Sequence, residues 1–166
     1  DTIPLQHTYL EPVKNEIAND NLKPQAFWGG DIYGINVNSV KRVSEALKNN
    51  NYRFFFATGY KQQHFDSMGF DVSNIDIGFF SKRKKYLDNI SKYGILVLAL
   101  DWPDESSVHK DELATIFPTK TPEYLATGAP ILVHCPSDYF MAQFFLDNDC
   151  GVVVTERDPV VLNEAI

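Results

Sequence analysis

Short apolar runs separated by longer amphipathic stretches follow one another along the whole chain. The apolar runs end at turn-forming residues and are typical of buried strands, over 26–28, 52–57, 75–80, 95–100, 130–134 and 152–154. The stretches between them carry apolar residues at helical spacing and predict helices, beginning at Asn38 or Ser39, spanning 62–68 and 82–91, and beginning at Thr121, Ser137 and Asp158. Strands that alternate with helices indicate an α/β domain with a parallel sheet.

The number of strand–helix units defines the expected topology. About six units fit a doubly wound, Rossmann-like sheet with the strand order 3-2-1-4-5-6. Residues 1–22 are polar with scattered prolines and predict a linker, which leaves 23–166 as a single domain. A polar stretch over 101–118 is expected to be a long loop, and long loops in compact domains are often functional.

Composition narrows the classes of protein that remain. The chain has 166 residues, of which 44% are hydrophobic, enough for one sizeable core. No apolar run reaches about twenty residues, so no membrane span or signal peptide is expected. The formal net charge of −7 argues against a nucleic-acid partner. Cys135 and Cys150 are expected to be buried thiols, and the absence of an initiator methionine predicts a longer gene product.

The stretch 118–139 combines a helix start, a carboxylate, a helix stop and a buried strand. Thr121 is expected to cap a helix with Pro122 in its first position, and Gly128 is expected to end that helix. Lys120 stands just before the helix and Glu123 on its first turn. A cation, a carboxylate and free helix amides together suit a phosphate beside a hydroxyl-rich group, as in a nucleotide sugar.

The expected strand order brings distant residues to one cleft. In doubly wound sheets, ligands bind at the carboxyl ends of the strands where the strand order reverses, here between the first and fourth strands. Gly29, Gly30 and Asp31 follow the first strand, and the segment 119–123 precedes the fifth. Phe79 and Phe80 end the third strand, and a loop follows the fourth after Leu100. We therefore expect these residues to line a common site.

The same string resembles the donor-binding half of GT-B glycosyltransferases, most closely glycosyltransferase family 4. That family's helix reads like E-Y/A-L/M-A-x-G-x-P-I/V-L, and the match runs through Lys120, Glu123, Tyr124, Leu125, Ala126, Gly128, Pro130, Ile131 and Leu132. The resemblance continues through the apolar run 150–154 and the last helix. It covers the C-terminal part of the chain in sequence, and the N-terminal part only in the order of elements.

The resemblance implies roles for particular residues. Glu123 would hold the ribose hydroxyls, and Thr119, Lys120 and Thr121 would lie against the diphosphate and the sugar. By the same resemblance, Gly78, Phe79 and Phe80 at the end of the third strand would contact the base.

The resemblance also implies an activity. It implies transfer of a sugar from a nucleotide-diphosphate sugar with retention of configuration, without a cofactor or bound metal, in polysaccharide or glycan synthesis. This chain would lack the acceptor-binding N-terminal domain and would bind donor without turnover. A cytoplasmic location is implied, with any contact at the inner membrane face made through the missing half.

The sequence departs from the family pattern at two places, and two alternative functions remain. Thr115 stands eight positions before Glu123, where many members carry a second glutamate that touches the transferred sugar. The turn after the first strand reads Gly29, Gly30, Asp31 where basic residues are common. A GT-B nucleotide-sugar epimerase shares the scaffold and the ribose glutamate. A non-catalytic flavodoxin-like or receiver-like binding module is the second alternative.

Other chemistries have weaker support. The glycines near residue 30 do not fit the spacing G-x-G-x-x-G of dinucleotide-binding domains. The Asp147–Asp149 string resembles a metal-binding D-x-D motif but ends a helix, so it predicts a surface turn. The four histidines are far apart in sequence and do not predict a zinc site. His134, at the end of the fifth strand, is expected near the cleft.

Overall fold

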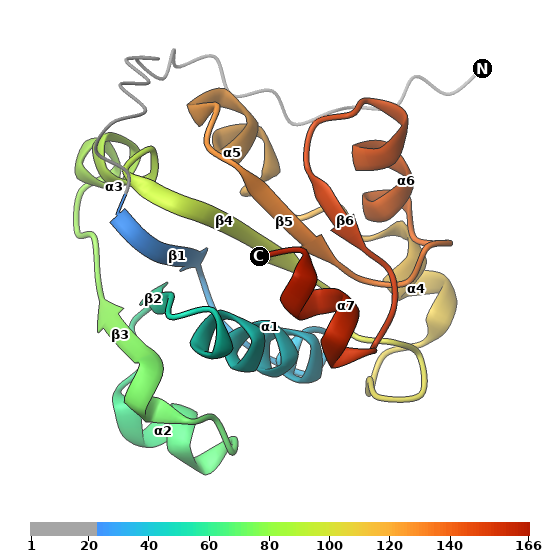
Figure 1. The fold of residues 1–166 in the computed structure, drawn as a ribbon, viewed down its shortest axis with the longest axis horizontal. Coiled ribbons are helices and arrows are strands. Elements are labelled where there is room, and N and C mark those ends of the chain that lie inside the picture. The colour runs from blue at the N-terminus through green and yellow to red at the C-terminus, as the bar shows by residue number, and fades with distance from the viewer. Residues whose placement is uncertain (1–22) are drawn as a thin grey trace.

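A computed structural model describes residues 23–166, which form one six-stranded sheet (Figure 1). The predicted linker over 1–22 lies outside these residues. The sheet has the order β3-β2-β1-β4-β5-β6, and every neighbouring pair is parallel. Its strands are β1 (Lys23–Gly29), β2 (Arg53–Ala57), β3 (Ile75–Gly78), β4 (Tyr93–Ala99), β5 (Ile131–His134) and β6 (Val152–Val154). The predicted fold class and strand order are confirmed.

Helices cover both faces of the sheet. One layer contains α1 (Val37–Asn49), α2 (Gln62–Ser67) and α7 (Pro159–Glu164), and α1 and α7 lie side by side in Figure 1. The other layer contains α3 (Arg83–Ile90), α4 (Lys110–Thr115), α5 (Thr121–Thr127) and α6 (Phe140–Asp147). A 3-10 turn, η2 (Val72–Asn74), leads into β3. The sheet is therefore the middle of three layers.

Alternation along the central strands divides the core in two. In β4, Val97 and Ala99 pack toward the α1 layer, whereas Leu96 and Leu98 pack toward the α5 layer. All four are at most 2% exposed. A strand buried on both faces has no polar side to mark its alternation, which is why its sequence is an unbroken apolar run.

The expected loop over 101–118 is wrong in its second half, because α4 forms there. The His109 ring accepts a hydrogen bond from the amide of Asp111 at 3.3 Å and caps the helix. Asp111 and Glu112 occupy the first turn, where carboxylates are favoured by the helix dipole. Leu113 is fully buried against the core, so one apolar residue anchors a helix too short to show periodicity.

Two predicted helix starts are displaced. Helix α5 begins at Thr121 with Lys120 as its N-cap residue, so Thr121 is the first helical residue instead of the cap. Helix α6 begins after Tyr139 instead of after Ser137. The Tyr139 hydroxyl donates to the carbonyl of Asp101 at 3.0 Å, a tertiary contact that positions this turn. Gly128 does end α5, at a φ of 67° that favours glycine.

The helix predicted at Asn38 or Ser39 begins at Val37, and neither side chain caps it locally. The cap comes from Asp101, which follows β4 and is fully buried. One Asp101 oxygen accepts from the Ser39 amide at 2.7 Å, and the other accepts from the Asn38 amide at 3.2 Å and the Asn38 side chain at 3.1 Å. A single carboxylate thus joins the end of β4 to the helix that follows β1.

We predict that Asp101→Ala lowers the free energy of unfolding by about 2–4 kcal/mol, because it leaves two helix amides without their acceptor. Asp101→Asn keeps one acceptor oxygen and should recover part of the loss. Urea denaturation monitored by circular dichroism measures both. Asp88→Ala, at an exposed position on α3, is the control. A loss no larger than in the control would contradict this role of Asp101.

Candidate functional site

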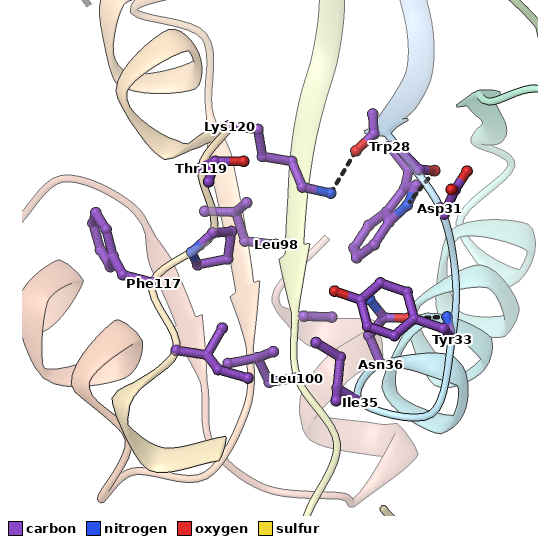
Figure 2. A pocket seen from close by; sticks show the side chains of 15 residues that line it. Trp28, Asp31, Tyr33, Ile35, Asn36, Leu98, Leu100, Phe117, Thr119 and Lys120 are labelled. Carbon is purple, nitrogen blue, oxygen red and sulfur yellow. Dashed lines mark hydrogen bonds between the residues drawn. The ribbon is translucent and has the colours of Figure 1, made fainter. Parts of the chain in front are cut away.

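A cavity of about 290 Å³ opens at the carboxyl ends of β1 and β4, where the strand order reverses (Figure 2). Three segments line it: 28–36 from the end of β1 and its turn, 98–100 from β4, and 116–120 before α5. This is the position at which doubly wound sheets bind ligands.

The turn after β1 has a shape that its glycines make possible. Gly30 has a φ of 102°, which side chains other than glycine rarely adopt. The turn closes through two bonds between Tyr33 and Asn36: the Tyr33 amide donates to the Asn36 side chain at 3.0 Å, and the Asn36 amide donates to the Tyr33 carbonyl at 2.9 Å. Ser106, from the loop after β4, donates to the Gly34 carbonyl at 2.6 Å. The turn is therefore fixed by hydrogen bonds within it and by a hydrogen bond from the loop after β4.

Lys120 is the cation of the cavity. Its ammonium donates to the Gly29 carbonyl at 2.6 Å and lies 3.5 Å from the centre of the Trp28 ring (Figure 2). Tyr124, one helical turn further on, accepts from the Gly29 amide at 3.0 Å. Lys120, the N-cap residue of α5, and Tyr124, four positions on, thus bind the carbonyl and the amide of Gly29, which fixes where the ammonium points.

The surroundings of Lys120 disfavour its charge. Burial lowers the pKa of Lys120 to about 7, and the Asp31 carboxylate opposes this shift. Asp31 itself is exposed and accepts from the Thr58 hydroxyl at 3.1 Å. Among the residues that line the cavity, Asp31 and Lys120 are the charged ones. An anionic group that entered the cavity would favour the protonated lysine.

The amides at the start of α1, near the cavity, are already occupied. The first amides of α1 bond to Asp101, so this helix start does not offer a free anion site. Sequence analysis missed this because the acceptor lies some sixty positions away in the chain. The sequence feature that could have indicated this cap is an aspartate, Asp101, directly after the apolar run 95–100.

Glu123 lies outside the cavity. Its side chain is 9% exposed, and its Oε1 atom accepts from the Arg83 guanidinium of α3 at 2.6 Å. Arg83 was not expected here and would not be found from sequence, because α3 meets α5 only in the folded chain. The pair sits one turn along α5 from Lys120, so a ligand that reached both would extend beyond the cavity.

The structure brings five of the nine expected site residues to the cavity: Gly29, Gly30, Asp31, Thr119 and Lys120. The other four are elsewhere. Phe79 follows β3 and is 74% exposed, Phe80 packs against Phe27, and Thr121 is buried. The roles of Glu123, Phe79, Phe80 and Thr121 toward a ligand stay predictions. Sequence analysis missed Trp28, Tyr33, Asn36, Ile116 and Phe117 as lining residues.

His134 is close to the cleft in sequence but does not line the cavity. Its ring donates from Nδ1 to the Val154 carbonyl at 3.0 Å and accepts from Arg42 at Nε2 at 3.2 Å. Burial lowers its pKa to about 4, so it is neutral. Arg42 in turn pairs with Glu105 at 2.8 Å and stacks on Trp102, so this cluster holds the loop after β4 in place. Its role is structural.

Within 23–166, no group of three or more histidine, cysteine, aspartate or glutamate side chains could hold a metal ion. No helix in the same range is long and apolar enough to cross a membrane. Both cysteines are free; Cys135 is buried as expected, whereas Cys150 is only partly buried.

Comparison with known proteins identifies the fold. No family model matches the chain, and no curated protein matches it in sequence. The C-terminal domain of a glycosyl transferase group 1 family protein (LpcC) from Francisella tularensis is similar in structure. Its TM-score is 0.52 at 12% identity, over 84% of this chain and 71% of that one.

AviGT4, a glycosyltransferase involved in avilamycin A biosynthesis, is also similar. Its TM-score is 0.54 at 12% identity, over 90% of this chain. This chain spans 43% of the length of AviGT4. The chain therefore has the fold of the C-terminal, Rossmann-like half of a GT-B glycosyltransferase.

The depressed pKa of Lys120 predicts a pH dependence of stability. The folded pKa is about 7 against an ordinary value of 10.5, so between these pH values the unfolded chain binds one more proton than the folded chain. The penalty is fully present below pH 7 and is relieved as pH rises, by at most about 1.4 kcal/mol per pH unit. Urea denaturation between pH 6.5 and 9 should show this rise relative to Lys120→Met. Parallel curves for the two proteins would contradict it.

Proposed function

We propose that this chain is the donor-binding half of a retaining GT-B glycosyltransferase and that its cavity holds the diphosphate of a nucleotide sugar. The observation that carries the proposal is the position of Lys120. Its ammonium enters a cavity at the strand-order reversal, and it belongs to the string 120–132 that resembles family 4 enzymes. The fold shared with two glycosyltransferases supports the same reading.

The diphosphate would bind beside Lys120. A phosphate oxygen near the ammonium would replace or share the bond to the Gly29 carbonyl and would raise the lysine pKa from about 7. When the bond between sugar and diphosphate breaks, negative charge grows on the leaving phosphate. A fixed cation in a partly dehydrated cavity stabilises that charge without reorganisation.

The ribose would lie next to Glu123. The carboxylate is held at Oε1 by Arg83 and has further lone pairs for ribose hydroxyls. Phe79, exposed just after β3, would contact the base. This arrangement needs no protein-bound metal, because Lys120 carries the compensating charge.

The acceptor would bind to a second domain. GT-B catalysis occurs between two halves, and this chain spans less than half of AviGT4. We therefore propose that the chain alone binds donor without turnover and that the complete enzyme acts at the cytoplasmic side in polysaccharide or glycan synthesis. A second domain would also supply the basic residues that the Gly29-Gly30-Asp31 turn lacks.

We predict that the isolated chain binds UDP or GDP with a dissociation constant of roughly 10 μM to 1 mM, since half of the closed cleft is absent. Isothermal titration calorimetry at pH 6.5 is the test, because pH values below the lysine pKa of about 7 favour its charged form. A folded sample that binds no nucleoside diphosphate at millimolar concentration would contradict the proposal.

Charge recognition and ribose recognition can be separated by two variants. Lys120→Ala should weaken UDP or GDP far more than the matching nucleoside, whereas Glu123→Ala should weaken both by about 1.5–3 kcal/mol. Lys92→Ala and Glu156→Ala, at exposed positions, are the matched controls. Equal losses for nucleotide and nucleoside in Lys120→Ala would place the phosphates elsewhere. Unchanged binding in Glu123→Ala would make Glu123 only the partner of Arg83.

A further inference from the structure

The start of α3 carries a dense run of positive charge. Lys82, Arg83, Lys84 and Lys85 are consecutive, and the segment 77–87 around them contains no carboxylate. All four side chains are exposed. The chain has 15 lysine and arginine residues and a formal net charge of −7, so these four form a local positive surface on an acidic protein. We call this surface the α3 patch.

The charges of the α3 patch do not stabilise the helix that they begin. Cations are unfavourable at a helix N-terminus, because the helix dipole is positive there. The first turn of α3 contains no acidic residue, and the N-cap residue Lys82 makes no side-chain capping bond. The reason for the basic run therefore lies outside α3.

Packing within the described chain accounts for one of the four cations. Arg83 pairs with Glu123 at 2.6 Å. Within residues 23–166, no carboxylate forms an ion pair with Lys82, Lys84 or Lys85. These three ammonium groups are therefore exposed to the surrounding solution. In Figure 1, the chain passes from β3 to α3 along one margin of the molecule, where a large partner has access.

The geometry of the α3 patch suits an extended anionic surface better than one small anion. Successive residues of an α-helix point about 100° apart, so the lysines of the first turn spread around the helix start. Flexible ammonium groups that spread in this way meet many separate phosphates more readily than they converge on one.

The composition of the α3 patch favours a membrane among extended anionic partners. Lysine is depleted in protein–protein interfaces, where aromatic residues and arginine are enriched. Nucleic acid requires a broad basic face, which a chain with a formal net charge of −7 lacks. A flat membrane contacts only one side of a protein, and salt screens the acidic residues that face away from it.

We propose that the α3 patch holds this half of the protein on an anionic membrane surface, with Lys82, Lys84 and Lys85 beside lipid phosphates. The family resemblance would place any membrane contact on the missing half, whereas this contact belongs to the half present here. The proposal is independent of the donor site, because none of the three lysines lines the cavity.

Vesicle sedimentation tests the proposal with the chain as it stands. The probes are vesicles of phosphatidylcholine alone and vesicles that also contain about 30% phosphatidylglycerol, at a salt concentration of about 0.05 M. The chain should bind the anionic vesicles at least about tenfold more tightly than the neutral ones. The preference should disappear at about 0.5 M salt, where screening is strong.

Matched variants test the residues. Lys84→Gln/Lys85→Gln should weaken binding to anionic vesicles by about tenfold or more, since each cation near such a surface contributes about fivefold. Lys84→Arg/Lys85→Arg keeps both charges and should bind like the parent. Lys92→Gln/Lys110→Gln changes the net charge equally at exposed positions outside the patch and should also bind like the parent. Circular dichroism verifies that each variant is folded before vesicles are added.

Three outcomes would overturn the proposal. The first is equal binding of the chain to neutral and anionic vesicles. The second is an equal loss in the Lys84/Lys85 and Lys92/Lys110 glutamine variants, which would mean that net charge acts instead of the patch. The third is binding of poly(U) RNA or polyglutamate, but not of anionic vesicles, that Lys84→Gln/Lys85→Gln abolishes. That result would assign the patch to nucleic acid or to an acidic protein.

Discussion

The buried carboxylate of Asp101 is the constraint on which the geometry of the site depends. It lies at the strand-order reversal and connects the end of β4 to the helix that follows β1. Its two oxygens bind the first amides of α1 and so tie the end of the turn from Gly30 to Asn36 to the end of β4. The Tyr139 hydroxyl binds the carbonyl of the same residue, so α6 is positioned by this point as well.

The cavity that results contains a buried lysine. Lys120 is held against Trp28 and the Gly29 carbonyl, and burial favours its neutral form. Groups with strongly shifted pKa values cluster at functional sites. A bound diphosphate would supply a negative charge that stabilises the protonated form of Lys120.

Much of the fold could be predicted because parallel strands and their crossover helices have strong local signatures. The run 95–100 is apolar enough to be a central strand, and Gly128 is the residue that a left-handed helix end favours. Helix α4 escaped because its six residues are too few for a period, and its stability comes from burying Leu113. The starts of α1 and α6 were not predicted because one distant residue, Asp101, positions both. Its carboxylate binds the first amides of α1, and its carbonyl accepts from the Tyr139 hydroxyl just before α6.

The sequence by itself determined the class of fold, the strand order and the five residues from Gly29 to Asp31 and from Thr119 to Lys120 that meet at the cavity. These follow from local periodicity and from the rule that parallel strands end at one edge. Only the tertiary structure decided that Arg83 pairs with Glu123, that Trp28 covers Lys120, and that the Phe117 ring packs on Phe144 of α6. Such pairings depend on where side chains from separate elements point after packing, and no spacing along the chain encodes that direction.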